Sequence, residues 1–227
     1  MKIITFPFAG GNTHSFNLLQ LDCLEVYEYP GRGMSVNELL LERIEDIITG
    51  FISKIRHCIK NEEYCIYGHS MGALVGYLFC VELEKLKLKL PRRLIVSGAK
   101  SPKYCREKIL SNLPDKVFWE EVCKLGGIPE ELNNHAELIE YFTPILKTDF
   151  RCIENYKYDK NTPKLSIPID VFYGSDEDIT RIKAEAWQEE TIANVNVTEL
   201  EGNHFFIFDQ KDFFAEYFKT LQLNATI

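Results

Sequence analysis

Two hydrophobic patterns alternate along most of the chain. Short, continuous runs of apolar or β-branched residues predict strands, and runs without polar interruptions are typical of strands buried on both faces. Longer segments repeat apolar residues at spacings of three and four, which predicts amphipathic helices. The expected strands are 2–6, 24–29, 64–67, 94–97, 169–173 and 195–200, and the expected helices are 12–21, 36–59, 73–86 and 213–221. This alternation implies a mostly parallel central sheet with helices on both faces.

The segment 101–167 breaks this alternation. It has helical patterns at 117–125 and 130–142 but no convincing strand. A helical insertion at this point is expected to lie over the C-terminal edge of the sheet, where open α/β proteins bind ligands. Gly126-Gly127 and Pro129 allow one helix to end and another to begin at a changed angle. Six residues of the insertion either line a pocket or form the insertion's own core: Phe118, Trp119, Leu125, Ile128, Tyr141 and Phe142.

Length and composition predict an ordinary soluble protein. A chain of 227 residues fits a single domain, here 1–227 with the insertion, and 45% hydrophobic residues supply a sizeable core. The net charge of -8 argues against nucleic acid as a partner. The apolar run at the N-terminus is too short for a signal peptide, and no stretch is apolar over the roughly 18 residues of a membrane span. We therefore expect no membrane contact.

The cysteines and histidines give no sign of a disulfide framework or a metal centre. Seven cysteines are scattered without CxxC spacing, and Cys65, Cys80 and Cys152 fall inside apolar runs. This usage is typical of a reducing compartment, so we expect a cytoplasmic protein in which cysteines serve as small buried hydrophobes. The five histidines are not spaced like zinc ligands relative to the cysteines, so no metal is expected.

The strongest chemical motif is Gly68-His69-Ser70-Met71-Gly72, a G-x-S-x-G between an expected strand and an expected helix. A sharp turn in this context holds a serine in a strained conformation and presents its hydroxyl above the sheet edge. The two glycines allow close backbone packing that a Cβ would prevent. Met71, at the helix N-terminus, is expected to aim its N–H at the oxygen of an attacked carbonyl. Ser70 is therefore the candidate nucleophile.

A nucleophilic serine needs a base, and His204 has the expected place. It follows the last expected strand, and the order nucleophile, acid, histidine along the chain is that of an α/β-hydrolase. His69 lies in the turn itself and is expected to pack there. The remaining histidines fall in helical contexts and are expected on the surface or in a satisfied core: His14, His57 and His135.

The acid is expected on the loop after strand 169–173, where Asp176, Glu177 and Asp178 are the three carboxylates. Asp176 is nearest to the strand end, with the apolar Ile179 beyond it to anchor the loop, so Asp176 is the predicted acid and Asp178 the alternative. A calcium loop would require the glycine and the later glutamate of an EF-hand, and the sequence has neither.

A second oxyanion donor is expected from the loop after the first strand, Phe6-Pro7-Phe8-Ala9-Gly10-Gly11, where glycines allow close approach to a ligand. These glycines match neither G-x-G-x-x-G nor a P-loop, so no nucleotide cofactor is expected. Pro30-Gly31-Arg32-Gly33 is interpreted as a turn bordering the site.

With these motifs, the chain resembles a known family, the type II (external, editing) thioesterases of nonribosomal peptide and polyketide synthesis, which are α/β-hydrolases. The matching segments occur in the family's order and cover nearly the whole chain. They are FPFAGGNTHSF (6–16), YPGRG (29–33), YGHSMGALVGY (67–77), LIVSGAKSP (94–102), LGGIPEEL (125–132), LKTDFRCIENY (146–156), VFYGSDED (171–178) and GNHFF (202–206).

The resemblance implies a Ser70, Asp176, His204 triad, with Asp176 favoured over Asp178 by counting back from Trp187. It assigns the oxyanion N–H groups to Ala9 and Met71, and it makes segment 101–167 a helical lid. It also implies hydrolysis of acyl thioesters on acyl or peptidyl carrier proteins, whose phosphopantetheine arm belongs to the substrate, so that no cofactor is needed. We expect a monomer.

Two other functions remain open at the level of sequence. One is a carboxylesterase, lipase or acyl-CoA hydrolase acting on free small molecules, and the other is a carrier-binding accessory protein without catalysis. Five basic residues either meet an acidic carrier protein or form a solvated helix end: Lys85, Lys87, Lys89, Arg92 and Arg93.

Overall fold

A computed structural model describes residues 1–60, 62–104, 109–126 and 135–223. Six strands form one sheet in the order β2-β1-β3-β4-β5-β6, and every neighbouring pair is parallel. The strands are β1 (Lys2–Phe6), β2 (Leu24–Val26), β3 (Tyr64–His69), β4 (Leu94–Ser97), β5 (Ile169–Gly174) and β6 (Val195–Leu200). Strands β3, β4 and β5 are buried throughout.

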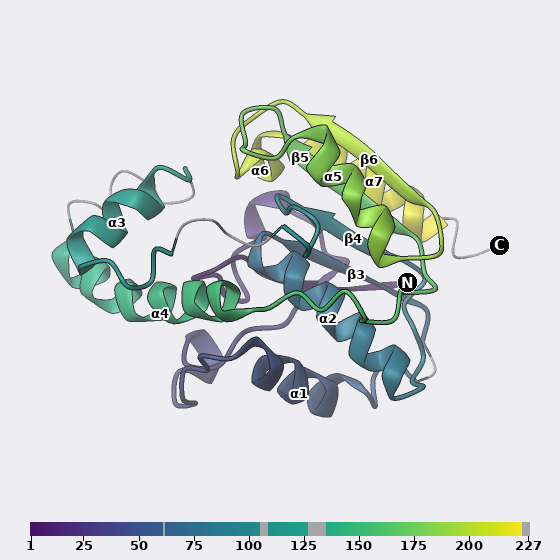
Figure 1. Ribbon diagram of the computed structural model, residues 1–227, viewed down its shortest axis with the longest axis horizontal. Helices are drawn as coiled ribbons and strands as arrows, with labels where there is room; N and C mark the ends of the chain where they lie inside the picture. Colours follow the sequence, from purple (N-terminus) through teal and green to yellow (C-terminus); the bar gives the residue numbers. More distant parts are fainter. Residues whose placement is uncertain (61, 105–108, 127–134, 224–227) are drawn as a thin grey trace.

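Helices cover both faces of this sheet (Figure 1). The α-helices are α1 (Ile44–Ile55), α2 (Met71–Lys85), α3 (Asp115–Cys123), α4 (Ala136–Asn155), α5 (Arg181–Glu185), α6 (Phe206–Asp209) and α7 (Lys211–Leu223). The 3-10 helices include η1 (Asn17–Leu19), η2 (Gly33–Ser35) and η4 (Ala186–Glu190). One core joins α1, α2 and η4 to one face of the sheet, and a second core joins η1, α6 and α7 to the other. This arrangement of sheet and helices is the α/β-hydrolase architecture expected from the sequence, and the similar solved structures described below agree with it.

Two helices are shorter than the apolar spacing predicts. Segment 36–59 is helical only from Ile44, because Leu39 is 85% exposed and does not pack against the sheet. Segment 12–21 contains only the three residues of η1. Its first residues are held in a loop instead, because the Ser15 hydroxyl accepts a hydrogen bond from the Asn12 N–H and the Asn12 side chain accepts one from the His14 N–H.

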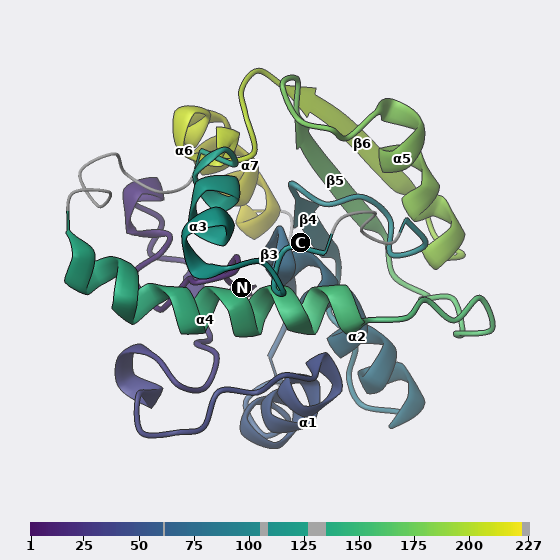
Figure 2. The same cartoon turned by 60° about the vertical axis from the view of Figure 1, so that its left-hand side comes forward.

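In the described residues between β4 and β5, the insertion contains the α-helices α3 and α4. Figures 1 and 2 place both helices at the end of the sheet where β3 leads into α2. The insertion has its own core, made by Leu110, Phe118, Trp119, Val122, Leu146 and Phe150. Phe118 and Trp119 therefore belong to the insertion's core, whereas Tyr141 is 47% exposed. Gly127, Ile128 and Pro129 lie outside the described residues.

Helix α4 extends farther than the predicted segment 130–142, of which 130–134 lie outside the described residues, and it contains Pro144. Proline removes a helical hydrogen bond and marks a place where a helix bends. Residues 136–138 and 140–141, before Pro144, are exposed, whereas most of 145–152 is buried. Within the described part of the chain, no helix is long and apolar enough to cross a membrane.

The three cysteines that the sequence placed in apolar runs are buried, as predicted. Burial raises the pKa of the Cys65 thiol to about 11 and that of Cys152 to about 12. These thiols pack as small hydrophobic groups.

Candidate active site

Ser70 occupies a strained turn between β3 and α2. Its backbone has φ 56° and ψ -114°, a conformation that residues with a Cβ rarely adopt. The turn is possible because a Cβ at Gly68 would overlap the Gly72 backbone and a Cβ at Gly72 would overlap the Phe6 carbonyl. The Ser70 N–H donates to the Ser97 carbonyl at 2.8 Å, which fixes the turn to β4. The sequence predicted this turn correctly.

His204 lies on the loop after β6 and faces the serine. Its Nε2 is 2.9 Å from Ser70 Oγ, although the two residues are 134 positions apart. The side chain is 17% exposed, and the neighbouring Phe205 ring packs against it with centroids 5.2 Å apart. The predicted pair of nucleophile and base is therefore brought together by the fold.

The acid that contacts His204 is Glu177. Its Oε1 lies 2.5 Å from His204 Nδ1, and its side chain is only 3% exposed. The other oxygen, Oε2, accepts a hydrogen bond of 2.7 Å from the Gly174 N–H at the end of β5. Ser70, His204 and Glu177 thus form a continuous hydrogen-bonded series. The prediction that Asp176 lies against the imidazole is wrong.

Asp176 and Asp178 point away from the imidazole toward other partners. Asp176 is exposed, and its carboxylate accepts a hydrogen bond from the adjacent Ser175 hydroxyl at 3.1 Å. Asp178 is 85% exposed and pairs with Lys100 at 2.8 Å and Lys183 at 3.6 Å. The hydrogen bond from Lys100 and the charges of both lysines lower the pKa of Asp178. The three successive carboxylates therefore diverge, and the alternative acid Asp178 is also displaced from the imidazole.

The physical reason for this correction is the turn at the end of β5. The Glu177 N–H bonds back to the Gly174 carbonyl at 3.2 Å, so the third residue after the strand, and not the second, returns to the sheet edge. Ile179, which follows this turn, is buried. The sequence carries no local signal for this turn, because the choice of inward carboxylate depends on how the chain folds back on Gly174.

The loop after β1 lies beside the serine, as predicted. The Gly11 N–H donates to the Phe8 carbonyl at 2.9 Å, and the Gly10 N–H donates to Asp149 Oδ2 at 2.7 Å. The two N–H groups that follow Ala9 are therefore engaged within the protein. Met71 is the first residue of α2, so its N–H has no acceptor in a preceding turn of the helix. The assignment of Ala9 and Met71 as oxyanion donors agrees with this arrangement and stays a prediction.

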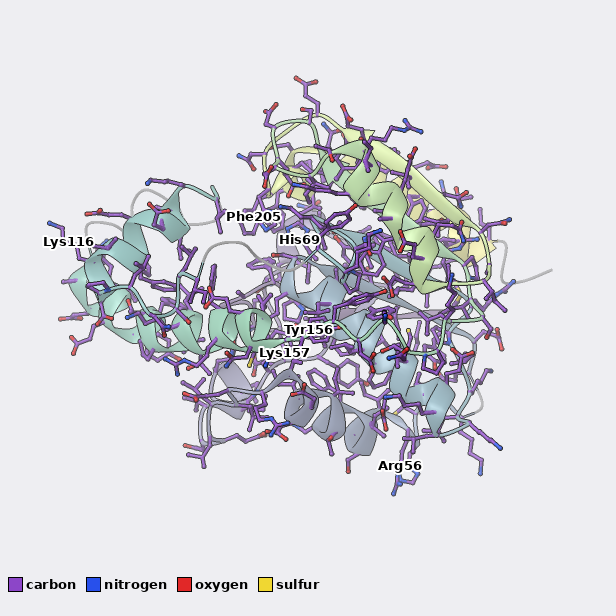
Figure 3. The ribbon with its side chains drawn as sticks, viewed as in Figure 1. Arg56, His69, Lys116, Tyr156, Lys157 and Phe205 are labelled. Atoms are coloured by element: carbon purple, nitrogen blue, oxygen red, sulfur yellow. The ribbon has the colours of Figure 1, made fainter. Side chains whose placement is uncertain are left out.

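His69 is fully buried beside His204, at the junction between the sheet and the insertion (Figure 3). Its Nδ1 is 2.9 Å from Ser97 Oγ, and its ring centroid is 5.1 Å from that of His204 and 5.5 Å from that of Phe205. Burial lowers the pKa of His69 well below its usual value, and the neighbouring His204 lowers it further. His69 packs in the turn, as expected, and remains a neutral imidazole beside the base.

The basic residues at the end of α2 are remote from this site. Helix α2 starts at Met71 and has 15 residues, so Lys85 lies about 20 Å from the serine. Lys89 and Arg92 pair with Glu63, and Lys85 pairs with Glu82. This arrangement favours the solvated helix end over a carrier-binding surface.

Comparisons with known proteins identify the family of this chain. The family model described as a thioesterase domain matches residues 1–221. The chain is 29% identical to the gramicidin S biosynthesis protein GrsT of Aneurinibacillus migulanus, over 93% of this chain and 84% of that protein.

Two solved structures are similar in sequence and in fold. RedJ, a thioesterase from the prodiginine biosynthetic pathway of Streptomyces coelicolor, superposes with a TM-score of 0.89 at 28% identity, covering 97% of this chain and 89% of that chain. YbtT, a type II thioesterase from the yersiniabactin NRPS/PKS biosynthetic pathway, superposes with a TM-score of 0.86 at 29% identity, covering 96% and 91%. Because the family match spans nearly the whole chain and the fold carries a serine–histidine–carboxylate series, this protein belongs to the thioesterase family.

Proposed function

We propose that this thioesterase hydrolyses acyl thioesters on the phosphopantetheine arms of carrier proteins in nonribosomal peptide or polyketide synthesis, and so clears stalled or wrongly primed carriers. The similarity of almost the whole chain to proteins named for biosynthetic pathways, among them a type II thioesterase of an NRPS/PKS pathway, supports the substrate class. The observation that carries the chemistry is the Ser70–His204–Glu177 series, with bonds of 2.9 and 2.5 Å.

In the proposed reaction, His204 Nε2 takes the Ser70 proton while Oγ attacks the thioester carbonyl. Glu177 holds the imidazole with its proton on Nδ1 and stabilises the positive charge that develops. The resulting oxyanion accepts hydrogen bonds from the Ala9 and Met71 N–H groups, each contributing on the order of 3 kcal/mol. His204 then protonates the departing phosphopantetheine thiolate, which leaves an acyl-serine.

Hydrolysis of the acyl-serine completes the cycle. His204 takes a proton from water, the hydroxide attacks the acyl carbonyl, and Ser70 leaves with the proton returned by His204. The products are a free carboxylic acid and the regenerated serine. A neutral His69 serves this cycle, because a second positive imidazole 5.1 Å away would oppose protonation of His204.

The test is a comparison of one acyl group on three leaving groups: a phosphopantetheinylated carrier protein, a short thiol such as N-acetylcysteamine, and an activated phenol. The proposal predicts a much larger kcat/KM for the carrier-bound acyl group, because binding energy from the arm and carrier assists the reaction. Ser70→Ala abolishes turnover, whereas the control Ser53→Ala, on the exposed side of α1, retains it. Equal kcat/KM values for all three substrates would favour a general esterase.

A further inference from the structure

A buried ion pair connects the insertion to the turn that follows β2. Arg32 and Asp149 are 4% and 1% exposed, and they form two hydrogen bonds of 2.5 and 2.6 Å. Arg32 comes from the turn after β2, and Asp149 comes from the buried half of α4. Two side chains from segments 117 positions apart are therefore locked in a bidentate pair.

The same carboxylate also holds the backbone of the β1 loop. Asp149 Oδ2 accepts the Gly10 N–H at 2.7 Å as well as one Arg32 N–H. One turn earlier on α4, Leu146 packs so closely on Gly10 that a Cβ there would lie 2.6 Å from its side chain. The φ of 77° at Gly10 independently requires glycine. Helix α4 thus fixes Gly10 by one polar and one apolar contact.

The other side of the loop is fixed by Tyr29, which is fully buried. Its hydroxyl donates to the Pro7 carbonyl at 2.7 Å, and its ring lies 5.2 Å from the Arg32 guanidinium carbon. Pro7 and Gly10 bracket Phe8 and Ala9, so the peptide that carries the Ala9 N–H is held from both ends. The bond from Gly10 to Asp149 therefore ties the buried ion pair to the loop that carries Ala9.

We propose that Asp149, oriented by Arg32, is a positioning residue for the oxyanion hole: it anchors Gly10 and thereby sets the direction of the Ala9 N–H. This inference rests on the proposed function for the role of Ala9. It also means that the buried half of α4 is part of the catalytic framework. A displacement of that half would carry Gly10 with it and disassemble the oxyanion hole.

The test compares two double variants that both remove the buried charges. Arg32→Met with Asp149→Asn keeps an oxygen that accepts the Gly10 N–H, whereas Arg32→Met with Asp149→Leu does not. Removing both charges avoids leaving one unpaired, and apolar replacement of a buried pair is often tolerated. The proposal predicts that the Leu variant has a kcat about 10- to 100-fold below that of the Asn variant, with KM changed by less than about threefold.

The rate at which a fluorophosphonate labels Ser70 supplies a second readout, because labelling places a phosphoryl oxygen in the oxyanion hole and requires no thioester. It should fall by the same factor as kcat. If the wild type labels at Ser70 but hydrolyses no acyl thioester, the proposed function fails while the labelling comparison still tests the inference. Equal kcat and equal labelling rates in the two double variants would overturn the inference.

Two further variants control for a general loss of structure. Arg93 and Asp170 form a less buried ion pair of 2.5 Å at the opposite end of β5, so Arg93→Met with Asp170→Asn should lower Tm and leave kcat unchanged below the transition. If the Leu double variant does not fold, Arg32→Lys replaces it, because lysine keeps the charge but loses the bidentate geometry. That variant should lose about 3- to 10-fold in kcat, and a wild-type kcat would overturn the inference.

Discussion

Replacement of Glu177 by glutamine is the sharpest test of the triad. The Gly174 N–H needs an acceptor, so the glutamine oxygen is expected to take the place of Oε2, 2.7 Å from that nitrogen. The glutamine NH2 group then faces His204 Nδ1, where Glu177 Oε1 now lies at 2.5 Å. A donor at this position stabilises the tautomer with its proton on Nε2, and that tautomer cannot accept the Ser70 proton.

The size of the effect follows from the loss of the correct tautomer. The equivalent aspartate-to-asparagine change in a serine protease triad lowers kcat by about 10⁴-fold. That factor corresponds to about 5.4 kcal/mol of transition-state stabilisation, at about 1.36 kcal/mol for each tenfold change. Glu177→Asp keeps the charge but withdraws it by about one methylene, and we expect a loss of about 10- to 100-fold.

The assay is steady-state thioester hydrolysis, with the competent enzyme counted by fluorophosphonate titration. Asp176→Asn and Asp178→Asn are the matched controls, since both residues lie on the same loop and are exposed. Both controls should stay within about threefold of wild type, because neither carboxylate contacts His204 and neutralising an exposed charge there has little effect. A loss of several orders of magnitude in Asp176→Asn, with near-normal Glu177→Gln, would refute the assignment.

Three further predictions concern the turn, the buried imidazole and the insertion. Gly72→Ala should abolish stable folding because its Cβ overlaps the Phe6 carbonyl. Gly50→Ala, which has open space around it on α1, should raise the free energy of unfolding by about 1 kcal/mol. Urea unfolding of both variants tests these two predictions. His69 stays neutral in the fold but is protonated in the unfolded chain below about pH 6.5, so the free energy of unfolding should fall as pH drops from 6.5 to 5. In urea titrations, His69→Gln should reduce the slope of the free energy of unfolding against pH by about 1.4 kcal/mol per pH unit. Amides of 136–142 should exchange hydrogen faster than those of 146–152, and equal protection by mass spectrometry would contradict a division of α4 at Pro144.

The sheet was predictable because its signals are local. Strands β1, β4 and β6 have the predicted bounds: β1 and β4 are mostly apolar or β-branched runs, and β6 combines β-branched residues with exposed polar ones. The strained turn at Ser70 was predictable for a similar reason, because the spacing of Gly68 and Gly72 is itself the steric requirement. His204 followed from chain order, which is a property of the topology.

The remaining features depend on contacts between distant segments. Leu39 fits a helical pattern, but its side chain is 85% exposed, and α1 begins only at Ile44. The choice of Glu177 depends on how the chain turns after Gly174, and proximity to the strand end favoured Asp176 instead. The bond between Asp149 and Gly10 joins residues 139 positions apart and has no local signature at all.

The most direct test of the central claim is to follow the acyl group itself. The protein is mixed with an acyl-phosphopantetheinyl carrier protein, quenched within milliseconds, digested and analysed by mass spectrometry. The account predicts that the carrier loses the acyl mass while the peptide containing Ser70 gains it transiently, and that free carboxylic acid then accumulates. An acyl group that stays on the carrier, or that appears on a residue other than Ser70, would contradict the account.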